Sequence, residues 1–116
     1  MTKKLFIYGT LKQDGCRASA MEGKFLGYVE TLPEHKLIDC GSYPGLIYDK
    51  DGGLSIKGEL WEVDESLMDH KLDQIEGVPI LYKRGQVKIK DCEDEVLTYI
   101  YQGKSKNYCG NEWKNK

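Results

Sequence analysis

The stretch Leu5-Phe6-Ile7-Tyr8 is an apolar run that ends abruptly at Gly9, and the fold is organised around it. A short apolar run that stops at a glycine is typical of a buried strand. Glycine permits a sharp turn and leaves main-chain N–H groups that an anion can bind. The stretch therefore predicts a buried first strand and a turn, which is either purely structural or anion-binding. It lacks the GxxxxGK(S/T) pattern of a P-loop.

Further strand-like segments follow along the chain, separated by loops rich in glycine and proline. Asp51-Gly52-Gly53 is a hairpin signal. The segment 96–101 is apolar on both faces, so we expect it near the centre of the sheet. The other strands are expected around residues 24–32, 36–40, 46–48, 56–63 and 87–89.

One helix is expected over residues 64–75. Asp64 is a favourable N-cap residue, and Gly77 followed by Pro79 is a typical stop signal. Apolar residues recur at helical spacing and should face the core on one side. These residues are Leu67, Met68, Leu72 and Ile75.

The whole chain, residues 1–116, is expected to be a single domain of the α+β class with a strongly bent or barrel-like sheet. Its 17 Lys and Arg against 19 Asp and Glu give a formal net charge of −2, without a long basic run. Nucleic acids and anionic membranes both attract concentrated positive charge, so we expect neither as a partner.

The four cysteines are widely spaced, with no CxxC pair and no histidine at ligand spacing, so we expect no metal site. The N-terminal apolar run is too short for a signal peptide or a membrane span. The sequence therefore predicts a cytoplasmic protein with reduced thiols. The cysteines are Cys16, Cys40, Cys92 and Cys109.

Glu76 is the carboxylate with the most unusual predicted surroundings. It lies at the edge of the apolar stripe, about 40° from Leu72 on a helical wheel. It also falls in the last helical turn, where the dipole disfavours negative charge, and Asp73 is a like-charged neighbour. These effects predict a raised pKa and a group suited to general acid–base catalysis. The alternative is a solvated glutamate that merely ends a helix.

Tyr43 and Tyr82 are candidate phenol donors for a bound ligand, although buried tyrosines more often serve in packing. His35 and His70 have no Ser or Cys at a recognisable triad spacing. We expect both histidines to be packing or surface residues.

Five motifs in this order resemble the γ-glutamylcyclotransferase-like superfamily, and most closely its small γ-glutamylamine cyclotransferase branch. The likeness covers roughly residues 4–102, and the combination is more specific than any motif alone. The motifs are Tyr8-Gly9-Thr10-Leu11-Lys12, Tyr43-Pro44-Gly45-Leu46-Ile47, Gly58-Glu59-Leu60-Trp61-Glu62-Val63, Leu72-Asp73-Gln74-Ile75-Glu76-Gly77 and Tyr82-Lys83-Arg84.

The resemblance implies a small mixed β-barrel with flanking helices and a cavity at one side. It implies an enzyme that cyclises a γ-glutamyl group to 5-oxoproline and releases the attached amine or amino acid, without metal or cofactor. The glutamate that moves protons would be Glu76. The backbone of Tyr8, Gly9, Thr10 and Leu11 would bind the glutamyl portion, and Tyr82 would line the pocket.

Two other functions stay open at this point, because some members of this fold lack the catalytic glutamate and fold alone does not give function. One is a non-catalytic protein that binds a small anionic metabolite in the same cavity. The other is an interaction module with an unused pocket. The identity of the released amine is also open, and a monomer is the default expectation.

Overall fold

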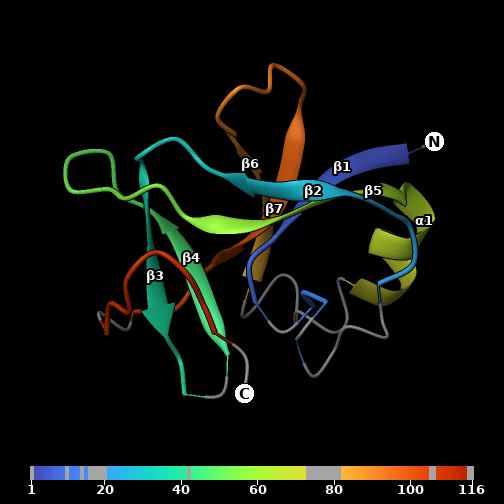
Figure 1. Ribbon diagram of the computed structural model, residues 1–116. Coiled ribbons are helices and arrows are strands. Elements are labelled where there is room, and N and C mark those ends of the chain that lie inside the picture. The colour runs from blue at the N-terminus through green and yellow to red at the C-terminus, as the bar shows by residue number, and fades with distance from the viewer. Residues whose placement is uncertain are drawn as a thin grey trace.

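The computed structural model describes residues 2–9, 11–13, 15, 21–41, 43–72, 82–104 and 107–114. In this part of the chain, seven strands form one mixed sheet, and a single helical segment follows the fifth strand (Figure 1). The helical segment is α1 (Glu65–Leu67) continued by η2 (Met68–Leu72). The strands are β1 (Thr2–Ile7), β2 (Lys24–Glu30), β3 (His35–Asp39), β4 (Pro44–Tyr48), β5 (Lys57–Asp64), β6 (Tyr82–Val87) and β7 (Val96–Tyr101).

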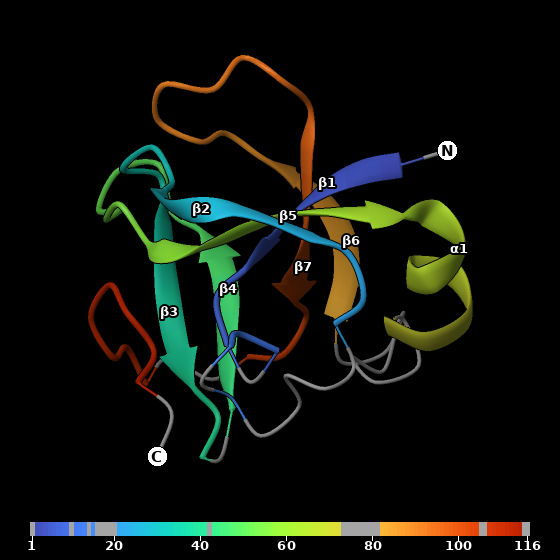
Figure 2. The ribbon, with the colours of Figure 1, turned by 45° about the vertical axis from the view of Figure 1, so that its right-hand side comes forward.

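The sheet has the order β2-β5-β1-β7-β4-β3, and β6 pairs with β7 beside this path. Strand β1 is antiparallel to β5 but parallel to β7, and β4 is also parallel to β7. In Figures 1 and 2, β2 and β5 cross the view while β3 and β4 run almost vertically, so the sheet is strongly bent. The α+β class is confirmed, but the described strands form an open sheet, so the small mixed β-barrel that the resemblance implied is not confirmed.

Strand β7 lies between β1 and β4, which confirms the central position predicted for residues 96–101. Strand β1 is also internal, and its side chains alternate between two apolar clusters, as the pleat requires. Phe6 and Tyr8 join the cluster that holds Leu37 and Leu46. The second cluster contains Leu5, Ile7, Leu11, Val63, Met68, Leu72, Tyr82 and Tyr99.

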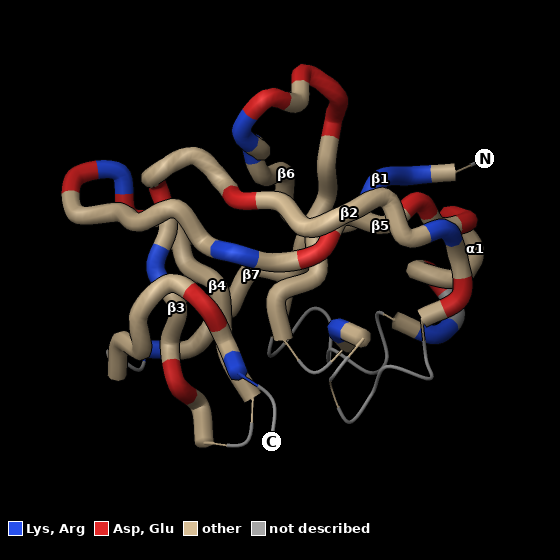
Figure 3. The backbone as a smooth tube through the Cα atoms, in the orientation of Figure 1, with Lys and Arg blue, Asp and Glu red and all other residues tan. Residues whose placement is uncertain are grey.

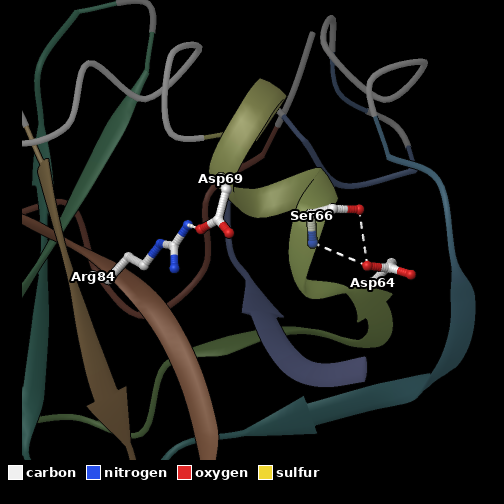
Figure 4. A network of polar contacts seen from close by, with 4 residues as sticks. All are labelled: Asp64, Ser66, Asp69 and Arg84. Carbon is white, nitrogen blue, oxygen red and sulfur yellow. Dashed lines mark hydrogen bonds and ion pairs between the residues drawn. The ribbon is translucent and has the colours of Figure 1, made fainter. Parts of the chain in front are cut away.

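The predicted N-cap of the helix is confirmed. The Asp64 carboxylate accepts hydrogen bonds from the N–H and the hydroxyl of Ser66, at 2.9 and 2.8 Å (Figure 4). Met68 and Leu72 are fully buried, as their spacing predicted. However, the α-helix spans only residues 65–67 and continues as a π-helix over residues 68–72. The apolar pattern predicts which side of the helix is buried, but it does not specify how tightly the helix is wound. Ile75, Gly77 and Pro79 lie outside the described residues.

Two local predictions were wrong: one about a hairpin and one about the bounds of a strand. Gly52 donates its N–H to Asp49 in a turn, but β4 and β5 are not paired across it, so Asp51-Gly52-Gly53 does not form a hairpin. Instead, Leu54 pairs with His35. The strand expected at 87–89 is β6, which ends at Val87.

Lysines and arginines are interspersed with acidic residues along the described chain (Figure 3). Among the described residues, no helix is long and apolar enough to cross a membrane. No group of three or more His, Cys, Asp or Glu side chains in the same ranges is placed to hold a metal. Cys40, Cys92 and Cys109 are free thiols, and Cys16 lies outside the described residues.

His35 should make the stability of the fold depend on pH. Its ring is only 3% exposed, with Nδ1 3.2 Å from the carbonyl oxygen of Ile47, and burial lowers its pKa below the ordinary value near 6.5. The unfolded chain therefore takes up a proton that the native ring resists, and stability falls as the pH drops below about 6.5. Urea unfolding at several pH values should show this loss, and His35→Gln should reduce it. Equal pH slopes in both proteins would contradict the prediction.

Candidate functional site

Gly9 and Leu11, in the turn after β1, are both closely packed. A Cβ atom on Gly9 would lie 2.8 Å from Cγ of Pro44, so only glycine fits without displacing the proline ring. The N–H of Lys12 donates to the carbonyl oxygen of Gly9 at 3.1 Å, and Leu11 is buried in the core. Gly9 is therefore required by the close approach of Pro44 at the start of β4.

Tyr8 uses its side chain to join two other strands. Its buried hydroxyl donates to the carbonyl oxygen of Tyr99 in β7 at 2.5 Å and accepts the N–H of Leu46 in β4 at 3.1 Å. The phenol of Tyr8 is thus part of the sheet. Any role of this residue in ligand binding falls to its backbone.

Tyr82 and Tyr43 meet next to the same proline. The hydroxyl of Tyr82, at the start of β6, donates to the carbonyl oxygen of Pro44 at 2.5 Å. The rings of Tyr43 and Tyr82 lie 6.4 Å apart between centroids. Pro44 therefore brings together Gly9, Tyr43 and Tyr82, which are more than 30 residues apart in the sequence.

Thr10 and Glu76 lie outside the described residues. The residues that flank Glu76 are nevertheless placed: Leu72 ends η2, and Tyr82 begins β6. Both belong to the apolar cluster that contains Leu11. Arg84 and Asp69 add an ion pair of 2.5 Å between β6 and η2 (Figure 4). Leu72 and Tyr82, the described residues on either side of Glu76, therefore lie in one apolar cluster with Leu11, and the Asp69–Arg84 ion pair also connects η2 to β6.

Two buried charges next to the turn were missed as functional candidates. Glu59 is 3% exposed, and both of its oxygens lie 3.2 Å from the N–H nitrogen of Gln13. Lys12 is 7% exposed and donates through Nζ to the carbonyl oxygen of Trp113 at 2.6 Å. The available signal for Glu59 was a charged residue within a segment predicted to be a strand, flanked by Gly58 and Leu60.

A hollow of about 830 Å³ opens beside Lys12, Gln13 and Glu59. Its rim carries charges of both signs, including Lys57 and Lys90. Lys12 and Gln13, just after the turn, therefore border a hollow that is lined by both charged and apolar residues.

A family profile described as gamma-glutamyl cyclotransferase, AIG2-like, matches residues 5–115. The chain belongs to this family. A Vibrio cholerae protein named "putative gamma-glutamylcyclotransferase" is 37% identical over 103 residues, covering 88% of this chain and 84% of that protein. The Rattus norvegicus protein named "gamma-glutamylaminecyclotransferase" is 30% identical over 113 residues, covering 84% of this chain and 75% of the rat protein.

The fold agrees with this membership. The crystal structure of an AIG2-like protein from Mus musculus superposes with a TM-score of 0.72 and 29% identity, covering 88% of this chain and 77% of that chain. The resemblance drawn from the five sequence motifs is therefore confirmed. The gamma-glutamyl cyclotransferase family is enzymatic, which supports an enzyme over a purely structural module.

Gly9→Ala should disturb the contact between the turn and Pro44. The added methyl group would force the proline ring to shift, and overpacking of this kind costs about 1–3 kcal/mol of unfolding free energy. Gly52→Ala is the matched control, because its Cβ would meet the far end of the Lys36 side chain at 3.3 Å and Oδ2 of Asp49 at an ordinary contact distance of 3.6 Å. Urea unfolding of both variants tests this, and equal losses would contradict it.

Tyr8→Phe should destabilise the junction of β1, β4 and β7. It removes the donor to Tyr99 and the oxygen that accepts the N–H of Leu46, both in the buried core. A lost buried hydrogen bond with a polar group left behind costs about 1–3 kcal/mol. Tyr48→Phe, at an exposed ring, should be near neutral in the same denaturation assay. A Tyr8→Phe variant as stable as the wild type would show that the junction does not need the hydroxyl.

Proposed function

We propose that this protein cyclises a γ-glutamyl amine or γ-glutamyl amino acid to 5-oxoproline and releases the free amine, with Glu76 as the proton-transfer group. The observation that carries the proposal is the meeting of Gly9, Tyr43 and Tyr82 around Pro44 in a chain of the gamma-glutamyl cyclotransferase family. The rat relative is named for γ-glutamylamines, which makes these compounds the first substrates to test.

The reaction is an internal acyl transfer. The α-amino nitrogen of the glutamyl group forms a bond to its own γ-carbonyl carbon, and the bond from that carbon to the leaving amine breaks. The α-amino group is protonated in water, so it must lose a proton before it can attack. The departing nitrogen must gain one. A single carboxylate with a raised pKa can accept the first proton and deliver it to the leaving amine.

Because both reacting groups belong to one molecule, much of the rate comes from holding the substrate in a folded-back conformation. In the proposal, the main chain of residues 9–11 binds the α-carboxylate and assists the oxyanion that develops on the γ-carbonyl. Gly9 supports this role because its backbone lies so close to Pro44 that no side chain fits between them.

Chain length supports placing Glu76 near the turn. Glu76 follows Leu72 by four residues, and four extended residues span at most about 14 Å. Leu72 and Tyr82 both pack in the cluster that holds Leu11, at the end of the turn. The segment between them therefore starts and finishes beside the proposed binding site.

Glu76→Gln tests the proton-transfer role. The amide is close in size to the carboxylate but cannot accept the substrate proton, so turnover should fall by about 10²–10⁴-fold while the fold is kept. The measurement is 5-oxoproline formation by mass spectrometry from a panel of γ-glutamyl amines and γ-glutamyl amino acids. Glu65→Gln, in α1, is the matched control and should keep the wild-type rate.

The outcomes separate the candidate functions. An unchanged rate in Glu76→Gln would remove Glu76 from the mechanism. A wild-type protein that binds 5-oxoproline in calorimetry but forms none from any substrate would be a metabolite-binding protein. Product formation with only some members of the panel would identify the class of released amine.

A further inference from the structure

We propose that Glu59 is a positioning residue for substrate binding. Its buried carboxylate holds the chain at Gln13, just after the turn, and so supports the main-chain positions of Gly9 and Leu11, to which the proposed function assigns substrate binding. This inference rests on the proposed function, because it concerns the same site. It assigns a role to a side chain that does not touch the substrate in the proposed mechanism.

The position of Glu59 in the sheet places it beside the turn. In the antiparallel pairing of β1 and β5, Glu59 lies opposite Ile7, the last residue of β1. Directly opposed residues of a pair point to the same face of the sheet. Glu59 therefore shares the face of Ile7, whose cluster also contains Leu11 and Tyr82.

The hydrogen bonds of Glu59 show what the carboxylate does. The N–H of Gln13 points between its two oxygens, at 3.2 Å from each, and the indole N–H of Trp61 donates to Oε1 at 3.0 Å. A buried carboxylate is costly unless donors satisfy it, and bonds of this charged kind are stronger than neutral ones. Both oxygens are occupied by donors of the protein, which fits a supporting role.

Gln13 is two residues beyond Leu11, so the turn is held before and after. Before the turn, Ile7 is fixed in the sheet by its pairing with β5. After it, the backbone of Gln13 is fixed by a side chain from the same strand. Removing the carboxylate would loosen the second end, which would keep the bond from the Lys12 N–H to Gly9, and would leave the first end intact.

The inference predicts a specific kinetic signature. In Glu59→Ala, we expect the KM for a γ-glutamyl amine and the Kd for 5-oxoproline to rise about tenfold, equivalent to about 1.4 kcal/mol. The kcat should also fall, because the same main chain is proposed to assist the developing oxyanion, but by less than the KM rises, since Glu76 is untouched. Calorimetry with 5-oxoproline gives the Kd, and initial-rate assays give KM and kcat.

Two conservative variants keep the test informative if the alanine variant does not fold. Glu59→Gln keeps the length of the side chain and one oxygen that can accept the N–H of Gln13, so it should stay near the wild-type KM. Glu59→Asp keeps the charge but withdraws the carboxylate by one methylene, so its KM should rise more. The opposite order would overturn the inference, because it would make charge rather than reach the important property.

Thr31→Val controls for simple loss of stability. Thr31 is fully buried, donates to the carbonyl oxygen of Leu32 at 2.8 Å and accepts the N–H of Ile56 at 3.0 Å. It should lower the melting temperature without changing KM. If folded Glu59→Ala keeps the wild-type KM and Kd, or if Thr31→Val raises KM equally, the positioning role is wrong. A wild-type protein without turnover or 5-oxoproline binding would instead refute the proposed function.

Discussion

The sheet depends on one buried hydroxyl group where strand β7 exchanges partners. Strand β7 pairs with β1 through Val96 and Leu97 and with β4 through Ile100. The Tyr8 hydroxyl lies at this exchange, donating to Tyr99 of β7 and accepting from Leu46 of β4. The residue that directly follows the first strand thus joins three strands, and the turn begins from this fixed position.

This arrangement explains why the candidate site lies where it does. The turn leaves β1 beside Pro44, whose ring lies against Gly9. The carbonyl oxygen of Pro44 accepts a hydrogen bond from the Tyr82 hydroxyl. The rigid ring of proline and the missing side chain of glycine let two loops and the start of β6 approach closely. The sheet therefore positions the proposed binding residues from these three segments, as the proposed intramolecular cyclisation would require.

The sequence was informative where a pattern has a local physical cause. The apolar run at 5–8 correctly predicted a buried strand, and the segment 96–101, apolar on both faces, correctly predicted a central strand. Asp64 was correctly predicted as the helix N-cap. The five motifs gave the family. What could not be predicted depends on distant partners. Asp51-Gly52-Gly53 does make a turn, but Leu54 pairs with His35 and the strands on either side separate. The buried bond from Gln13 to Glu59 likewise forms only when β5 lies beside β1.

The bond from Lys12 to Trp113 joins residues 101 positions apart, and the bond from Tyr8 to Tyr99 joins residues 91 positions apart. Contacts of such separation form late, because the loops between them must first be closed. During synthesis on the ribosome, the motif at residues 8–12 could form these bonds only after Tyr99 and Trp113 have been made. The nascent protein would then complete the proposed binding turn in one of the last steps of folding, and chains shortened at the C-terminal side would lack its contacts.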